Sequence, residues 1–195
     1  MLTDILKIII AQFGLHRDFL LKVMPKNSVC AEIGVYKGDF SKKILDVLNP
    51  QKLHLIDPWR YESAEIYKES LYGGRSGSQV AMDKIFEDVK KRFEPDIIAG
   101  RVVLHRKSSH EASLDFPDNY FDWIYIDANH QYEFVKKDME MYFNKIKKGG
   151  FIAGDDYADG GWWQGGVKKA VDELIGSGTV EKIIIKNRQF ILQKI

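Results

Sequence analysis

The sequence contains a single cysteine and no long hydrophobic run. Cys30 alone cannot form an internal disulfide, and one thiol is too few for a cysteine-rich zinc site. Because Cys30 lies in an apolar run, we expect a buried and unreactive thiol. No apolar stretch reaches the roughly 18 residues of a membrane span, and the first residues lack the pattern of a signal peptide. These absences predict a soluble, cytoplasmic protein with no membrane partner.

The sequence also lacks an excess of charge of either sign. Lys and Arg number 29 and Asp and Glu 28, so the formal net charge is +1. Proteins that bind nucleic acid through a broad basic surface carry a larger positive excess. Disordered chains contain fewer hydrophobic residues than the 45% found here. We therefore expect a folded protein that does not act on nucleic acid.

Repeats, low-complexity tracts and proline-rich linkers are absent as well, so residues 1–195 are expected to form one domain. An N-terminal helix is predicted at 1–25, because apolar positions recur at helical spacing until Pro25 ends the pattern. Short apolar runs then alternate with longer stretches of helical period. The runs lie at about 29–34, 53–57, 102–105, 121–126 and 150–154. This alternation is typical of a parallel sheet with both faces covered by helices.

The end of the sequence follows a different pattern. Val180–Ile185 and Phe190–Ile195 are β-rich runs separated by polar residues around Asn187, which predicts an antiparallel hairpin at one edge of the sheet. The predicted fold class is α/β: a Rossmann-like, mainly parallel seven-stranded sheet flanked by helices, with a C-terminal antiparallel hairpin.

Residues 60–101 form a longer connection than a simple crossover between strands requires. The pattern predicts a helix-like segment to about residue 71, a glycine-rich stretch, and a second helix to about Phe93. We interpret the region as an insertion or lid over a substrate; an ordinary solvated connection is the alternative.

A glycine turn follows the first predicted strand. Glu32 precedes Gly34 by two residues and Gly38 follows it by four, just before a helix that starts near Asp39. Glycines at such a turn let the backbone approach a ligand, and the helix N-terminus favours electron-rich groups. The spacing differs from the dinucleotide fingerprint G-x-G-x-x-G. A ligand-binding turn is predicted, although a tight turn alone would also use glycine.

An acidic residue, Asp57, ends the second predicted strand. A carboxylate at this place can accept hydrogen bonds from both ribose hydroxyls of a nucleoside. Asp57 follows the glycine turn by about 20 residues, which is the expected distance. By itself, an aspartate before Pro58 is also typical of a turn. Together with the glycine turn, Asp57 favours nucleoside binding.

Three further acidic residues follow the fourth and fifth predicted strands: Asp127, Asp155 and Asp156. Neighbouring parallel strands would bring all three to the same carboxyl edge of the sheet. Carboxylates crowded in this way repel one another unless a cation or proton joins them, and oxygen ligands suit Mg²⁺. The set predicts a metal site. The alternative is that one or two of these residues cap a helix or bind loop backbone.

Taken together, these motifs resemble those of the class I S-adenosylmethionine (SAM)-dependent methyltransferases, over about residues 29–175. More narrowly, the chain is similar to the small O-methyltransferases related to macrocin and mycinamicin sugar methyltransferases and to a cephalosporin-biosynthesis protein. The stretches that extend the resemblance are 126–132, 149–157 and 166–173.

The resemblance implies SAM as the cofactor. It implies that Glu32, Gly34 and Gly38 surround the methionine part and that Asp57 holds the ribose. Trp59 is expected near the adenine or the cofactor's rim, and Tyr36, a glycine in many relatives, is expected to tighten the loop or cover the ligand. The full set of implied cofactor-binding residues is Glu32, Gly34, Tyr36, Gly38, Asp57, Trp59, Ser108, Ser109 and Asp127.

In metal-dependent relatives, acids at these places bind Mg²⁺, so the resemblance implies Asp127, Asp155 and Asp156 as ligands. Methyl transfer from a sulfonium is a one-step displacement, in which positioning and an ionised nucleophile supply most of the catalysis. His130 is the candidate base, since the similar catechol methyltransferases have a lysine at that offset from the first acid; Asp127 is the alternative. The Trp162–Trp163 pair is predicted to form a substrate wall or to pack on the last helix.

The predicted function is therefore Mg²⁺-assisted O-methylation of a small hydroxylated molecule, such as a sugar or natural product. Three alternatives stay open: a metal-independent methyltransferase acting on nitrogen or carbon, a nicotinamide-dependent oxidoreductase, and a non-catalytic nucleoside-binding module. The N-terminal helix and the hairpin are each a candidate face for a homo-oligomer. The sequence identifies neither the methyl acceptor nor the oligomeric state.

Overall fold

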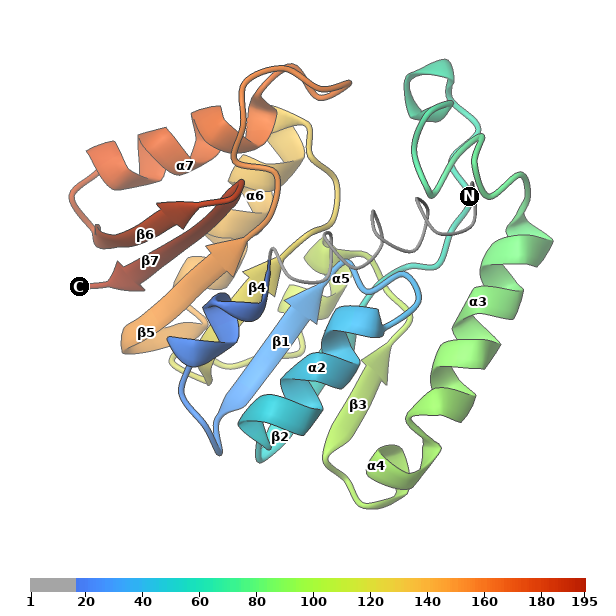
Figure 1. Cartoon of the computed structure of the whole chain (residues 1–195), viewed down its shortest axis with the longest axis horizontal. Coiled ribbons are helices and arrows are strands. Elements are labelled where there is room, and N and C mark those ends of the chain that lie inside the picture. Colours follow the sequence, from blue (N-terminus) through green and yellow to red (C-terminus); the bar gives the residue numbers. More distant parts are fainter. Residues whose placement is uncertain (1–16) are drawn as a thin grey trace, which may run out of the picture.

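A computed structural model describes residues 17–195, whose strands form one seven-stranded sheet (Figure 1). The strands are β1 (Val29–Ile33), β2 (Lys52–Ile56), β3 (Val102–His105), β4 (Phe121–Ile126), β5 (Ile146–Gly154), β6 (Val180–Lys186) and β7 (Gln189–Lys194). Most of the predicted N-terminal helix lies outside the described residues. The described part of it contains the short 3₁₀ helix η1 (Leu20–Lys22).

The strand order is β3-β2-β1-β4-β5-β7-β6. Strands β1 to β5 pair in parallel, whereas β7 is antiparallel to both β5 and β6. This arrangement confirms the predicted Rossmann-like, mainly parallel sheet with an antiparallel hairpin at one edge. Each of the five apolar runs forms a strand, and β5 begins earlier than predicted, at Ile146.

Helices cover both faces of the sheet. They are α2 (Asp39–Leu48), α3 (Gln79–Arg92), α4 (Glu94–Ile98), α5 (Ser109–Ser113), α6 (Tyr132–Phe143) and α7 (Gly166–Gly176). Since successive strand side chains point to opposite faces, Cys30 packs with residues of α2 and α3, and Ala31 packs with residues of α5, α6 and α7. Cys30 is fully buried, as predicted, and this burial raises the pKa of its thiol.

The strand order determines which loops meet. Because β1, β4 and β5 are neighbours, the loops that follow them share one edge of the sheet. Strand β7 runs antiparallel to β5, so the turn at Asn187 and Arg188 lies at this edge too, and the Tyr157 amide donates to the Arg188 carbonyl at 2.8 Å. The hairpin therefore belongs to the surroundings of the predicted site.

The region between β2 and β3 differs in part from the prediction. The second helix is confirmed as α3, and α4 follows it. The predicted helix up to residue 71 is wrong: the segment contains only the 3₁₀ helix η2 (Glu65–Tyr67) and turns. A Cβ on Gly73 would lie 2.0 Å from the Tyr67 carbonyl oxygen. The chain thus folds back tightly on itself here instead of continuing as a helix.

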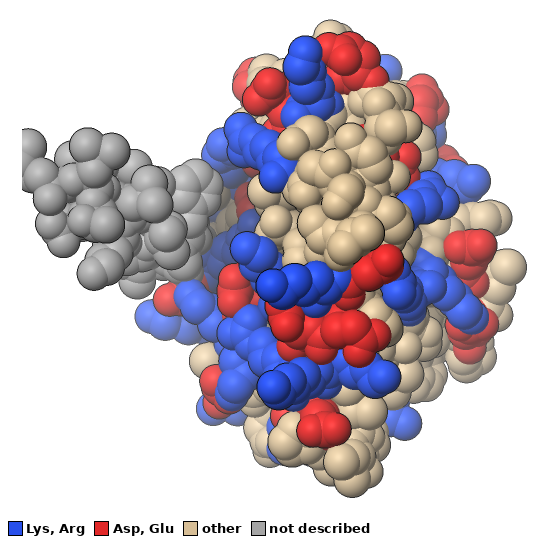
Figure 2. Space-filling model, turned by 90° about the vertical axis from the view of Figure 1, so that its right-hand side faces the viewer, with Lys and Arg blue, Asp and Glu red and all other residues tan. Residues whose placement is uncertain are grey.

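The surface beside α3 carries both signs of charge. Figure 2 shows Lys and Arg side chains interspersed with Asp and Glu on this side of the molecule, in agreement with the balanced composition. No helix in the part of the chain that the structure describes is both long and apolar enough to span a membrane.

Candidate active site

Two adjoining cavities lie at the carboxyl edge of the sheet. Cavity A, of about 240 Å³, extends from Asp57 to Ser108, Ser109 and α6. Cavity B, of about 630 Å³, contains the acidic residues that follow β4 and β5. The residues that line both cavities are Gly34, Ser70, Tyr72, Ala128 and Trp162. The predicted site residues therefore divide between two spaces with a common wall.

Gly34 allows the loops after β1 and β4 to touch. Its φ is +91°, and a Cβ there would lie 2.1 Å from the carbonyl oxygen of Asp127. The amide of Asp127 in turn donates to the Ile33 carbonyl at 2.8 Å. Gly34 is required by this close approach, and it lies between the two cavities as a ligand-binding turn would.

Asp57 is fully buried and organises the glycine turn. Its Oδ2 accepts hydrogen bonds from the amides of Val35 and Tyr36, both at 2.9 Å, and from the Tyr72 hydroxyl. Its Oδ1 accepts from the Trp59 amide at 2.7 Å. Burial raises the pKa of Asp57, and these hydrogen bonds oppose that rise. Asp57 thus joins the turn to the insertion that carries Tyr72; its contact with a ribose stays a prediction.

Glu32 faces cavity B and is 2% exposed. Burial raises its pKa to about 8, although the hydrogen bond from the Ser41 hydroxyl opposes this shift. Gly38, with φ +72°, precedes α2 as its N-cap and packs close to the Phe93 ring. Glu32 and Gly38 thus lie at opposite ends of the predicted turn, and of these two residues Glu32 lines cavity B.

Trp59 lies in the core, and its implied place near the adenine or the cofactor's rim stays a prediction. It is fully buried, packs against Phe86 with ring centroids 5.0 Å apart, and lines neither cavity. A positive φ of 41° turns the chain after Pro58, and the Trp59 indole nitrogen donates to the carbonyl of Tyr36 at 2.8 Å. Trp59 therefore supports the loop from within the core, while Tyr36 lines cavity B.

Ser108 and Ser109 line cavity A, but their hydroxyls already have partners. The Ser108 hydroxyl accepts a hydrogen bond from the Glu111 amide at 3.2 Å and caps α5. The Ser109 hydroxyl donates to Asp138 on α6. The predicted adenine contact of both serines stays a prediction.

Asp127, Asp155 and Asp156 come together at cavity B, as expected for the ends of neighbouring parallel strands. Each also has a basic or amide partner. Nη1 of Arg17 lies 2.8 Å from Oδ2 of Asp127, and the same guanidinium donates to Asp155. Gln189 donates to the other oxygen of Asp155, and Arg188 forms an ion pair with Asp156.

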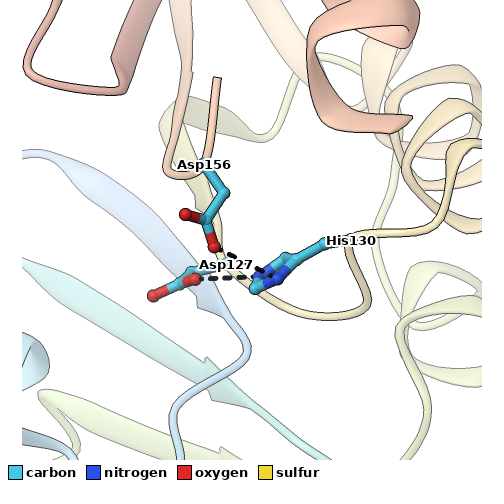
Figure 3. Close-up of side chains that lie close together, drawn as sticks. All are labelled: Asp127, His130 and Asp156. Atoms are coloured by element: carbon cyan, nitrogen blue, oxygen red, sulfur yellow. Dashed lines mark hydrogen bonds and ion pairs between the residues drawn. The ribbon is translucent and has the colours of Figure 1, made fainter. Parts of the chain in front are cut away.

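His130 lies between two of these carboxylates (Figure 3). Its Nε2 is 3.3 Å from Oδ1 of Asp127, and its Nδ1 is 3.1 Å from Oδ2 of Asp156. The second contact lacks hydrogen-bond geometry, so Nδ1 is buried with no hydrogen-bond partner among the described residues. Burial lowers the pKa of His130, but the negative charge of the surrounding aspartates more than offsets this and raises it overall.

The sequence analysis missed the partners of the acidic residues. Arg17 comes from the segment before β1, Arg188 from the hairpin turn, and Gln189 from the start of β7. Gln189 is 1% exposed and accepts a hydrogen bond from the Tyr125 hydroxyl at 2.7 Å, so its amide holds Asp155 in place. The antiparallel pairing of β5 with β7 is what brings Arg188 and Gln189 here, and the hairpin pattern alone did not reveal this pairing.

The donor set fits a divalent cation. One ligand atom each from Asp127, His130 and Asp156 lies within 4.8 Å of the others. Two carboxylate oxygens and one imidazole nitrogen are common ligands of divalent metals, and the unpartnered Nδ1 of His130 would gain a partner. Asp155 lies outside this set, and its oxygens accept hydrogen bonds from Arg17 and Gln189.

Several O-methyltransferases of known structure share this fold. NovP is 20% identical, with 92% of this chain and 76% of that chain covered and a TM-score of 0.62. TomG from Streptomyces achromogenes, solved with SAM, is 15% identical over 95% of this chain and 79% of its own, with a TM-score of 0.62. A Bacillus cereus O-methyltransferase, solved with SAH (S-adenosylhomocysteine), is 14% identical over 95% and 80%, with a TM-score of 0.60.

A sequence relative is the uncharacterized protein R132 of Acanthamoeba polyphaga mimivirus, which is 40% identical over 81 residues. The match spans 39% of this chain and 37% of that protein. A family model described as a methyltransferase domain matches residues 31–157, which contain both the glycine turn and the acidic residues after β4 and β5. The chain belongs to this methyltransferase family.

Proposed function

We propose that the protein is a SAM-dependent O-methyltransferase that acts on a small hydroxylated acceptor with the help of a divalent cation. The observation that carries the proposal is the pair of cavities that meet at Gly34 and Ala128. Displacement at a sulfonium methyl requires the two reactants to be held in line. A cofactor that extends from one cavity into the other, with the acceptor beside its methyl group, meets this requirement.

Cavity A suits the nucleoside part of the cofactor, since the buried Asp57 lines it. Cavity B holds Glu32 beside Gly34, where the methionine part of the cofactor would enter. Solved O-methyltransferases of the same fold include complexes with SAM and with SAH, which supports this assignment. The acceptor would then lie deeper in cavity B, beside the acidic residues and Trp162–Trp163.

Asp127 and Asp156 would hold the cation, with Asp155 beside them, and His130 would serve either as a third ligand or as the base. A bound divalent cation lowers the pKa of a hydroxyl and fixes its direction. The three carboxylates exceed the two arginines of the cluster by one negative charge when His130 is neutral. A divalent cation would reverse that sign, and an ionised acceptor oxygen would balance it. The charges of the site are therefore suited to Mg²⁺ or a similar ion.

The acceptor must lose a proton, and two residues of the cluster can take it. His130 has an unpartnered Nδ1 that faces the cluster, and Asp127 lies next to it. The same Nδ1 lone pair cannot bind a cation and accept a proton at once. If His130 binds the cation, Asp127 takes the proton.

A metal-independent methyltransferase is the second candidate. Arg17 and Arg188 already form ion pairs with all three aspartates, which reduces their need for a metal. Turnover in EDTA separates the two proposals: the first predicts loss of activity and its return with Mg²⁺, and the second predicts no change.

Thermal unfolding with SAH or NAD⁺, each with Mg²⁺ or EDTA, tests the proposal first. A ligand at ~100 times its Kd adds about 2.7 kcal/mol, which raises Tm by roughly 5–10 °C for a chain of this size. We expect such a rise with SAH. A rise with NAD⁺ instead would contradict the methyltransferase proposal. SAH binding without transfer of labelled methyl to any hydroxylated compound of a broad panel would favour a non-catalytic module.

A further inference from the structure

A buried carboxylate, that of Asp138, lines cavity A together with Asp57. Asp138 is 4% exposed and lies on the buried side of α6, together with Val135, Met139 and Tyr142. One of its oxygens accepts a hydrogen bond from the Ser109 hydroxyl; the other has no hydrogen-bond partner among residues 17–195. That oxygen is not one of the fully enclosed side-chain atoms without a partner, so it opens into cavity A. Asp138 therefore points to a ligand group that donates a hydrogen bond.

Cavity A offers no other acceptor of this kind. All four hydrogen bonds described for Asp57 come from protein groups. The side-chain oxygen of Asn129 accepts from the Gln131 amide at 3.0 Å. Glu62 pairs with Arg60 at the rim, where 34% of its side chain is exposed. Among the acidic residues that line cavity A, Asp138 is thus the buried one whose second oxygen can still accept a hydrogen bond from a ligand.

We infer that Asp138 accepts a hydrogen bond from the exocyclic amino group of adenine and so makes cavity A selective for a 6-aminopurine cofactor. The inference rests on the proposed function, because it requires an adenosyl group in cavity A. With the ribose near Asp57, the base would extend toward Ser109 and Asp138, which line the same cavity as Pro58 and Phe134. A carboxylate accepts a hydrogen bond from the amino group, whereas a purine that carries only hydrogen at carbon 6 has no donor at this position.

The pKa of Asp138, raised to about 6 by burial, leaves it ionised at pH 8. A hydrogen bond to an ionised group contributes more to affinity than one between neutral groups. The amino group of adenine should therefore increase the affinity of the ligand for this protein by about 10- to 100-fold.

The test is a cycle of two proteins and two ligands at pH 8, measured by calorimetry in EDTA. The ligands are SAH and its 6-deamino analogue, which keeps the purine ring and the homocysteine part. The proteins are the wild type and Asp138→Leu, whose side chain suits the apolar side of α6. Glu140→Leu, on an exposed position of the same helix, is the matched control. Asp138→Asn, which keeps an acceptor but loses the charge, serves if the leucine variant does not fold.

We expect wild type and Glu140→Leu to bind SAH about 10- to 100-fold more tightly than the analogue. Asp138→Leu should bind both ligands alike, within about threefold, and Asp138→Asn should discriminate less than the wild type does. Equal binding of both ligands by the wild type would overturn the inference. An equal loss of affinity for both ligands in Asp138→Leu would also overturn the inference, because it would mean that Asp138 only supports the structure. Failure of the wild type to bind either ligand would instead overturn the proposed function itself.

Discussion

Arg17 holds Asp127 through its Nη1, at 2.8 Å from Oδ2, and uses its other terminal nitrogen to bind Asp155. A guanidinium thus bridges two of the three carboxylates that the family resemblance assigns to a metal. The same guanidinium lies 5.6 Å from the ring centroids of Phe40 and Tyr125. Arg17 is therefore built into the cluster, and it competes with any divalent cation for the charge of these aspartates.

Arg17→Gln should make the protein depend more on metal. Without the guanidinium, Asp127 and Asp155 repel each other, so we expect a loss of about 1–3 kcal/mol in the free energy of unfolding in EDTA. Mn²⁺ should bind more tightly than to the wild type and restore part of the loss. Urea unfolding and Mn²⁺ titration measure both effects. Lys42→Gln, which breaks only an exposed pair with Asp46, should change neither. Weaker Mn²⁺ binding by Arg17→Gln would show that Arg17 supports the metal site.

His130 as the base predicts a rise of activity with pH. The base must be neutral, and the pKa of His130 lies above its ordinary value because of the aspartates around it. Turnover should therefore increase as pH rises through a pKa above about 6.5, and His130→Ala should lower kcat by about 10²- to 10⁴-fold. Mn²⁺ affinity should stay within about threefold of wild type. A tenfold weaker Mn²⁺ affinity in the variant would instead identify His130 as a ligand and leave Asp127 as the proton acceptor.

The buried His54 should make stability depend on pH. Nδ1 of His54 lies 2.9 Å from Nε2 of His105, and its Nε2 lies 3.1 Å from the Tyr120 hydroxyl. Burial and the neighbouring His105 lower the pKa of His54 to about 3. Below about pH 6.5 the unfolded chain therefore binds a proton at His54, whereas the folded chain does not bind it until the pH approaches 3. The free energy of unfolding thus decreases as pH falls from about 6.5 toward 3.

His54→Leu removes this dependence and keeps an apolar side chain on the sheet face. We expect wild type to lose about 1–4 kcal/mol relative to the variant between pH 7 and pH 4. Unfolding in urea at several pH values gives the difference directly, since other titrating groups are common to both proteins. A constant difference across this range would show that His54 does not stay neutral in the folded protein.

Gly34→Ala should destabilise the fold far more than an alanine at another glycine with positive φ. Its Cβ would lie 2.1 Å from the Asp127 carbonyl, so the loops after β1 and β4 must separate. We expect a cost of about 3–5 kcal/mol. Gly100→Ala is the matched control, because its φ is +71° but no atom lies within 4 Å of the added Cβ; about 1 kcal/mol is expected there. Equal losses in urea unfolding would mean that the close approach is unimportant.

The prediction of the fold from sequence succeeded where local pattern and long-range packing agree. The apolar runs that became β1, β4 and β5 are buried on both faces, so each reads as a strand without knowledge of its neighbours. The meeting of Asp127 with Asp155 was predictable for the same reason, since parallel neighbours end at one edge. The false helix before residue 71 had a helical pattern, but the contact of Gly73 with the Tyr67 carbonyl depends on tertiary folding.

The partners of the site could not be predicted in this way. Arg188 and Gln189 lie far along the sequence from Asp155, and only the pairing of β7 with β5 places them beside it. The family resemblance implied that Trp59 lies near the adenine or the cofactor's rim. The positive φ at Trp59 directs its ring into the core, and no local sequence signal indicates that direction.

Strand β7 lies between β5 and β6 although it follows both in the sequence. During synthesis on the ribosome, β6 therefore emerges before the strand that attaches it to the sheet exists. Strand β6 joins the sheet only through β7. Because the same hairpin carries Arg188 and Gln189, the acidic cluster is complete only when this last edge has docked. Assembly of the acidic cluster thus depends on the docking of this hairpin.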